Sequence, residues 1–287
     1  MPLARVPVQA MRVTTVRPPG VEQKTVACAD LHRQSQGMDP TVDANRAVWE
    51  TASLKHVREH DDLLADGRRG GSLVPAELAV LGPLLATRPV VVHLQSGHGL
   101  DDLDLVRHGA RWVLGVDYSE VAAGAARRRA ELLGLPCHYV VAEVPGVPVG
   151  EGAADLVYTG KGALIWMRDL DAWAGEVARL LRPGGHLVVH EGHPLVPLWT
   201  WDADRPRIRT DRSYFGHSHV NDTFPGDGAV EWQWPLGQIV TALATAGLTV
   251  QRLTEHPEPF WRPGGVDAAA WDGRLPNTYT LLAQRSG

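Results

Sequence analysis

Apolar strands and helices alternate along the chain after residue 74, and this alternation constrains the fold more than any other feature. Short apolar runs predict strands buried on both faces of a sheet, at 89–95, 111–117, 137–143, 154–160 and 186–192. Helical patterns lie between several of them, at 100–109, 119–134 and 170–185. The order predicts an α/β fold with a doubly wound parallel sheet.

Residues 194–234 interrupt this rhythm. They have no helical or strand period and are rich in tryptophan, tyrosine and histidine. A segment of this length inside a compact domain predicts a lid, a substrate-binding insertion or disorder, and we favour a lid or substrate-binding insertion. A helix over 235–248 and two strands, 249–256 and 277–285, then complete the sheet.

The chain is expected to divide into three parts. Residues 1–38 are rich in proline and arginine, lack a period and predict a disordered tail. Residues 39–88 predict an N-terminal helical cap, since Thr41 or Asp43 can cap a helix. Residues 89–287 form the main domain, which carries the insertion.

Composition limits the classes of function. The 44% of hydrophobic residues can supply a large core, and the net charge of −5 gives no basic field for nucleic acid. Two cysteines cannot form a disulfide framework or a cysteine metal site. The sequence has no apolar run of membrane-spanning length and no apolar signal core at its start. We expect a soluble, cytoplasmic protein that binds neither nucleic acid nor membrane.

Two glycines, Gly97 and Gly99, follow the first predicted strand in the stretch VVHLQSGHGLDDL. Ligands of such sheets bind at the carboxyl ends of the strands, where glycines let the backbone approach and the next helix offers free N–H groups. Asp117 ends the second strand and can accept both hydroxyls of a ribose, while Glu143 ends the third, where an adenine would lie. The pattern predicts a cofactor that contains adenosine.

Two such cofactors differ in what they ask of the turn. The NAD fingerprint has glycine or alanine in its third place, where this chain has Asp102. An acid at a helix start competes with a pyrophosphate for the same N–H groups. S-Adenosyl-L-methionine has no phosphate and a zwitterionic amino-acid end, so acids near the turn favour it over NAD.

At these positions the sequence resembles the class I S-adenosylmethionine-dependent methyltransferases. The resemblance covers residues 43–285, through the glycine turn, GVDYS, AEV, ADLVYTG and LLRPGGHLVV. It resembles more narrowly a bacterial small-molecule subgroup with an HLQ-type turn, an NR-x-x-W helix and an HE-x-HP strand end, here Asn45, Arg46, Trp49, His190, Glu191, His193 and Pro194. The resemblance implies a Rossmann-like seven-stranded methyltransferase sheet, its last strand antiparallel, with an N-terminal helical cap and an inserted lid.

The chain departs from the wider family at two positions. His93 replaces its usual acid and Gln95 its first glycine, so we expect Asp101 to do part of the missing acid's work on the methionine end. A structural strand-end histidine is the alternative role for His93. The cofactor-binding residues implied are His93, Gln95, Ser96, Gly97, Gly99, Asp101, Asp117, Tyr118, Ala142, Glu143, Val144 and Thr159.

The methyl acceptor is expected above the ends of the fourth and fifth strands. His193 is the first choice for a general base, with His190 and Glu191 behind it, because histidine titrates near neutrality and a nearby Glu can fix its tautomer. The alternative for His193 is a hydrogen-bonded structural histidine. The substrate-binding residues predicted are Trp49, Lys161, Trp166, Tyr214 and His217.

The histidine pairs 190/193 and 217/219 also raise a metal site, but one pair ends a strand and the other lies in a loop, so no metal is predicted. The Trp49 helix is expected to close over the cofactor as a second part of the lid. The function predicted is methyl transfer from S-adenosyl-L-methionine to an O or N atom of a small molecule. The alternatives are a methyltransferase of RNA or protein, a binder of the cofactor that transfers no methyl group, such as a cyclase or regulator, and an NAD-dependent reductase.

Overall fold

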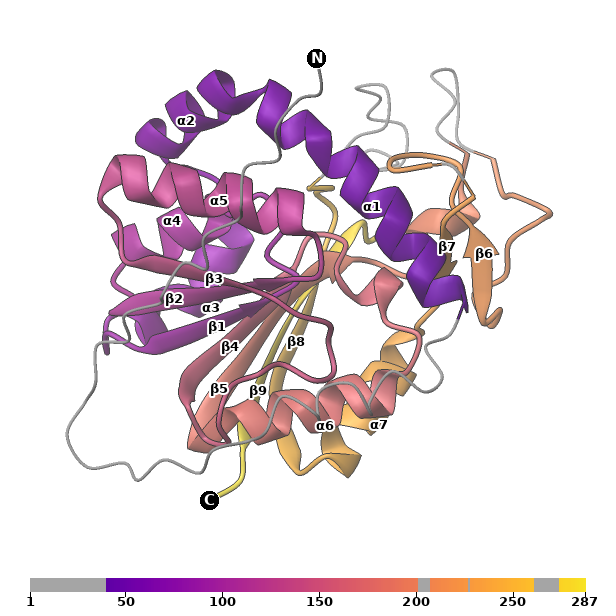
Figure 1. The fold of residues 1–287 in the computed structure, drawn as a ribbon. Coiled ribbons are helices and arrows are strands. Elements are labelled where there is room, and N and C mark those ends of the chain that lie inside the picture. Colours follow the sequence, from indigo (N-terminus) through magenta and orange to yellow (C-terminus); the bar gives the residue numbers. More distant parts are fainter. Residues whose placement is uncertain (1–39, 201–206, 227, 261–273) are drawn as a thin grey trace, which may run out of the picture. The chain divides into compact units, whose positions relative to one another are not determined.

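Figure 1 shows the fold in a computed structural model that describes residues 40–200, 207–226, 228–260 and 274–287. Seven strands form the main sheet in the order β3-β2-β1-β4-β5-β9-β8. The first five are parallel, whereas β9 runs antiparallel between β5 and β8. The strands are β1 (Val90–Leu94), β2 (Trp112–Asp117), β3 (Cys137–Val141), β4 (Ala154–Gly160), β5 (Leu181–Gly192), β8 (Leu248–His256) and β9 (Thr278–Arg285). The predicted doubly wound sheet with an antiparallel last strand is confirmed.

Helices cover both faces of this sheet. One face packs against α3 (Pro75–Leu85), α4 (Leu100–Arg107) and α5 (Glu120–Leu133), and the other against α6 (Leu170–Leu180) and α7 (Leu236–Thr245). Local chemistry sets where the helices begin: the Ser119 hydroxyl accepts the Ala122 N–H at 2.9 Å, and Asp169 does the same for Ala172 at 2.8 Å. Gly134 ends α5 in the left-handed conformation.

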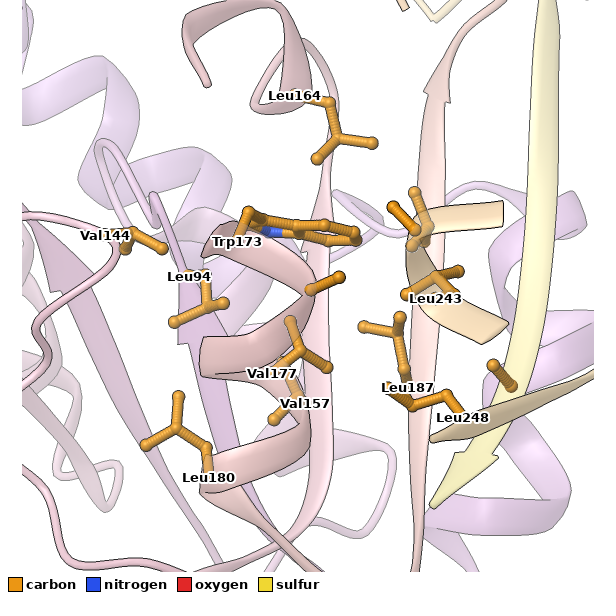
Figure 2. Packing of buried hydrophobic residues seen from close by; sticks show 14 of the residues in the cluster. Leu94, Val144, Val157, Leu164, Trp173, Val177, Leu180, Leu187, Leu243 and Leu248 are labelled. Carbon is orange, nitrogen blue, oxygen red and sulfur yellow. The ribbon is translucent and has the colours of Figure 1, made fainter. Parts of the chain in front are cut away.

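Successive side chains of the central strands enter the two cores in turn. In β4, Val157 packs toward α6 and α7, and its neighbours Leu156 and Tyr158 pack toward the opposite helices. Trp173 of α6 is fully buried in the core between the sheet and helices α6 and α7 (Figure 2). Burial on both faces explains why these strands have continuous apolar sequences.

The helices before β1 belong to the same unit of the chain, which begins at Asp39. They are α1 (Pro40–Arg58), α2 (His60–Arg69) and α3. The tail predicted over 1–38 lies outside the described residues, so that prediction is not tested. Among the residues described, no helix combines the length and the apolar character needed to span a membrane.

The described part of the insertion, 194–200, 207–226 and 228–234, contains regular elements that its sequence does not predict. It contains a short helix, η2 (Val196–Leu198), and a second sheet of two antiparallel strands, β6 (Ser218–Val220) and β7 (Val230–Trp232). Helix α1 packs along α5 and reaches this hairpin (Figure 1). The Asn45 side chain donates to the Val230 carbonyl at 2.7 Å and accepts the Val230 N–H at 2.8 Å, as a neighbouring strand would.

Candidate functional site

The turn after β1 has an unusual backbone. Gln95, Gly97 and Gly99 all have positive φ, at 57°, 53° and 77°. At Gly99 a side chain would also collide with its neighbours: a Cβ there would lie 2.6 Å from the Tyr139 hydroxyl and 2.7 Å from Ala126 Cβ. Gly99 thus lets α4 pack closely against α5 and β3.

A cavity of about 310 Å³, here called the turn cavity, lies against this turn. It draws its walls from the ends of β1, β2 and β4 and from α1. Seven predicted cofactor-binding residues line it: His93, Gln95, Ser96, Gly97, Asp101, Asp117 and Tyr118. Three predicted substrate-binding residues line the same cavity: Trp49, Lys161 and Trp166.

Asp117 ends β2 with a fixed, buried carboxylate. Its oxygens accept the N–H of Gly97 at 2.9 Å and of Ser119 at 2.8 Å, and the Trp49 side chain from α1 also bonds to it. Burial raises the pKa of this carboxyl, and these hydrogen bonds oppose the rise. These three donors leave about one of the carboxylate's four lone pairs for a ligand hydroxyl.

Asp101 lies in a buried ion cluster under the same cavity. Lys161 Nζ is 2.6 Å from Asp101 and 3.3 Å from Glu77, and it donates to the Ser72 carbonyl at 2.7 Å. Burial acts to raise the pKa of Asp101, but the Lys161 ammonium lowers it to about 2. Asp101 is therefore an ionised carboxylate at the cavity wall.

His93 and Gln95, the two residues that depart from the wider family's pattern, each have a partner in the structure. His93 Nδ1 lies 2.6 Å from Asp102, and both side chains are buried. Asp102 is thus directed into the core, which differs from our premise that it would compete at the helix start. The Gln95 side chain donates to the Ala163 carbonyl at 2.7 Å and fastens the turn to the loop after β4.

Other predicted cofactor-binding residues lie away from the turn cavity. Glu143 faces Arg46 of α1 at 3.5 Å, and Thr159 is buried with its hydroxyl toward the Leu94 carbonyl. The full set that does not line the cavity is Gly99, Ala142, Glu143, Val144 and Thr159.

A second cavity, about 340 Å³ and here called the insertion cavity, meets the first at Gly162 and Phe260. It lies over the ends of β5 and β9 and under the insertion. Aromatic rings form much of its wall, from Trp199, Trp232, Trp234, Phe260 and Tyr279. Its charged or titratable residues are Glu191, His193, Arg209, Arg212, His219, Asp222 and Glu231.

The three predicted catalytic residues have different surroundings. Glu191 lines the insertion cavity, and its carboxylate accepts the N–H groups of Gly162, Ala163 and Leu164 at 2.7–3.0 Å. Burial raises the pKa of Glu191, against these three hydrogen bonds. The residue therefore holds an acid of raised pKa where the two cavities meet.

The two histidines are less suited to accept a proton. His193 accepts the Leu195 N–H on Nδ1 at 3.1 Å and lies 2.8 Å from Glu255 through Nε2, so both ring nitrogens are engaged. His190 lines neither cavity, and burial lowers its pKa to about 4. Both ring nitrogens of His190 lack a hydrogen-bond partner among the residues described.

Two predicted substrate-binding residues lie outside both cavities. Tyr214 packs on Phe215 and accepts the Leu236 N–H at 3.4 Å, and His217 is exposed. Sequence reasoning missed the arginines and Glu231 of the insertion cavity, because an irregular segment gives no period from which to tell its inner face. His219, which we had paired with His217, lies 2.9 Å from Glu231. Within the described ranges, no group of three His, Cys, Asp or Glu could hold a metal ion.

Comparison with known proteins assigns this architecture. Residues 91–185 match the sequence model of the family described as "Methyltransferase domain". Over these residues the chain is similar to the S-adenosylmethionine-dependent methyltransferases, whose fold it shares. The match covers the glycine turn, Asp117 and the strands up to β5, and no comparison tests the narrower HLQ subgroup.

Curated proteins and solved structures are also similar to this chain. The chain is 37% identical over 107 residues to demethylmenaquinone methyltransferase of Thermus thermophilus, covering 36% of this chain and 47% of that protein. It is 35% identical over 132 residues to a 4-amino-L-phenylalanine/4-methylamino-L-phenylalanine methyltransferase of Streptomyces pristinaespiralis, covering 37% and 44%. The chain thus spans less than half the length of these relatives. An S-adenosylmethionine-dependent methyltransferase structure from Mesorhizobium loti superposes with a TM-score of 0.57 at 24% identity, over 71% of this chain and 96% of that one.

The turn cavity offers groups that suit the family's cofactor, S-adenosyl-L-methionine. Asp117 lines the cavity and can accept a ribose hydroxyl, and ionised Asp101 suits the ammonium of the methionine end. Gln95 and Ser96 line this cavity, and Gln95 Oε1 and Ser96 Oγ are buried without a hydrogen-bond partner among the described residues. The donor and acceptor set therefore fits this cofactor.

Proposed function

We propose that the protein transfers a methyl group from S-adenosyl-L-methionine to an oxygen or nitrogen atom of a small molecule. The observation that carries the proposal is the meeting of the two cavities at Gly162 and Phe260, one with cofactor-binding chemistry and the other rich in aromatic rings, with Glu191 in its wall. The cofactor supplies an electrophilic methyl group on a sulfonium. Relatives named for a quinone precursor and an aromatic amino acid support a small-molecule acceptor.

Each cavity has a separate task in this proposal. Asp117 and Asp101 hold the two ends of the cofactor in the turn cavity. The tryptophans of the insertion cavity hold the acceptor and exclude water, because methyl transfer depends mainly on alignment in a dry site.

Glu191 is the proposed proton acceptor. Its three backbone donors fix the carboxylate beside Gly162, and its raised pKa brings it closer to the pKa of a protonated oxygen or nitrogen nucleophile. His193 is proposed as a positioning residue, since its two hydrogen bonds connect the segment after β5 to β8.

Calorimetric titration with S-adenosylhomocysteine tests the cofactor assignment. The wild type should bind it, and Asp117→Ala should weaken binding by about tenfold or more, because a hydrogen bond to a charged group contributes about 1.5–3 kcal/mol. Asp171→Ala, which removes an exposed acid in the first turn of α6, is the matched control and should bind as the wild type does. Binding of NADH with no binding of S-adenosylhomocysteine would refute the proposal.

A second measurement separates a methyltransferase from a protein that only binds the cofactor. Small aromatic alcohols and amines are incubated with the protein and S-adenosyl-L-methionine labelled in its methyl group. Label in an acceptor supports the proposal. Tight cofactor binding with no labelled product across such a panel would favour a non-transferring binder.

A further inference from the structure

The charged wall of the insertion cavity is asymmetric. Arg209 and Arg212 line it, with side chains 22% and 10% exposed. Their acidic partners, Asp211 and Asp222, are 57% and 51% exposed. The cavity wall therefore carries both guanidinium groups and one of the two carboxylates, that of Asp222, which is about half exposed.

The two arginines are held with different strength. Arg209 binds Asp211 through Nε and Nη2 at 3.1 and 2.7 Å, and Asp222 through Nη1 at 2.6 Å, so all three of its nitrogens are engaged. Arg212 has only longer ion pairs, 3.4 Å to Asp211 and 3.3 Å to Asp222, and donates to the Val220 carbonyl at 2.9 Å. Its buried Nε has no hydrogen-bond partner among the described residues.

An unpartnered guanidinium nitrogen beside two weak ion pairs is available for a new anion. Arginine presents a planar fork that matches a carboxylate, and exchanging an exposed aspartate for a ligand carboxylate keeps the charge paired. Because Asp211 and Asp222 are exposed, water stabilises them when the exchange occurs.

The rest of the cavity defines the body of the ligand. Trp199, Trp232 and Trp234 offer flat faces, and apolar side chains including Ile165, Val196 and Ile239 fill the space between them. Glu191 lies at the end that meets the turn cavity, where a second carboxylate would be repelled. A ligand with one anionic end is therefore oriented with its uncharged end toward the cofactor.

We propose that the insertion cavity binds an aromatic acceptor that carries a carboxylate, which pairs with Arg212. This inference rests on the proposed function, since it names the acceptor class of that same site. Arg209 keeps the cluster in place, and Arg212 supplies the specificity.

Two probes of equal ring size test this class: 2-naphthoate and uncharged 2-naphthalenemethanol. Each is titrated by tryptophan fluorescence into the protein saturated with S-adenosylhomocysteine. The wild type should prefer naphthoate by about tenfold, a usual contribution of a charge-assisted bidentate pair. Arg212→Gln should abolish the preference while leaving the alcohol's affinity within about twofold. Arg128→Gln, on the exposed face of α5, is the matched control and should retain the preference.

Asp211→Asn provides a change of opposite sign. Asp211 pairs with both arginines and does not line the cavity, so its neutralisation should raise naphthoate affinity by about threefold. Equal affinity of the two probes for the wild type would overturn the inference, as would a preference that persists in Arg212→Gln with an unchanged melting temperature. A different result would contradict the proposed function: a wild-type protein that does not bind S-adenosylhomocysteine, which is added before the probes.

Discussion

The buried carboxylate of Glu191 binds the loop that separates the two cavities. Its oxygens accept the N–H groups of Gly162, Ala163 and Leu164, so the acid is both a loop anchor and the proposed proton acceptor. Glutamine keeps one acceptor oxygen, which can still accept the Ala163 and Leu164 N–H groups, but its NH2 group can accept neither a proton nor the Gly162 N–H. The variant Glu191→Gln therefore removes the proton acceptor and retains part of the anchor.

We expect Glu191→Gln to lower kcat by about a hundredfold, the usual contribution of a general base, with little change in S-adenosylhomocysteine affinity. A base acts when deprotonated, and burial raises the pKa of Glu191, so wild-type kcat should rise with pH through a value above the ordinary glutamate range. The variant should lose this rise. A variant with wild-type kcat and an unchanged pH profile would show that Glu191 is only an anchor.

At the residue scale, sequence was most informative where one residue type has one physical use. Asp117 after a parallel strand predicts a carboxylate at the sheet edge, and it lines the turn cavity. The tertiary partners of His93 and Lys161 could not be derived, because Asp102 and Glu77 meet them only through packing across α4 and α3. Lys161, predicted to hold a substrate, lines the turn cavity and pairs with two acids of the protein itself.

Helix α1 connects the two cavities. Its Trp49 lines the turn cavity, bonds to Asp117 and packs edge-to-face on Phe224 of the insertion, with ring centroids 6.0 Å apart. One helical turn earlier, Asn45 pairs with Val230 of β7. The segment around β6 and β7 lines the insertion cavity. Helix α1 therefore lines the turn cavity and also contacts a segment that lines the insertion cavity.

Asn45→Ala should loosen this connection. Loss of two hydrogen bonds to the backbone should speed amide exchange around Val230 by about fivefold, which corresponds to about 1 kcal/mol for the pair's net contribution. In the wild type, S-adenosylhomocysteine should slow amide exchange in both α1 and β7. In Asn45→Ala it should slow exchange in α1 alone. Thr51→Ala, which removes a bond within the same helix, is the control. Equal protection of β7 in the wild type and Asn45→Ala would contradict the coupling.

The parallel strands of the main sheet could be predicted because a strand that is buried on both faces has a continuous apolar sequence. The β6–β7 hairpin was not, because its strands have three residues each and include His219 and Glu231. It is stabilised by Asn45, which lies 185 residues away from Val230 in sequence. No local pattern can report a contact of that kind.

Across the molecule, titratable groups collect on the face of the sheet that α3 and α4 cover. His93 pairs with Asp102, Tyr158 donates to Glu77, and Lys161 joins Glu77 to Asp101. Burial raises the pKa of Asp102 and of Glu77, against the pull of their basic neighbours. His190 on β5 lies near this group and interacts electrostatically with Lys161, His256 and Asp101.

Stability should depend on pH through buried histidines. Burial lowers the pKa of His190 to about 4, so the folded protein keeps this ring neutral, while in the unfolded chain it gains a proton near pH 6.5. The unfolded state therefore binds more protons between these values. The stabilisation is complete above pH 6.5 and is lost as pH falls toward about 4. His56 and His98 have lowered pKa values and act in the same direction, whereas buried acids of raised pKa oppose them.

A difference between two proteins isolates the contribution of His190. His190→Leu replaces a buried ring whose nitrogens lack partners among the described residues, so the unfolding free energy near pH 7 should be equal or higher. Between about pH 7 and about pH 5 the wild type should lose about 2 kcal/mol more than the variant, because the linked proton is absent from the variant. Urea unfolding at both pH values measures this, with exposed His138→Gln as the control. An identical pH dependence of the wild type and His190→Leu would mean that His190 gains no proton when the protein unfolds, and that the acid sensitivity belongs to the other buried groups.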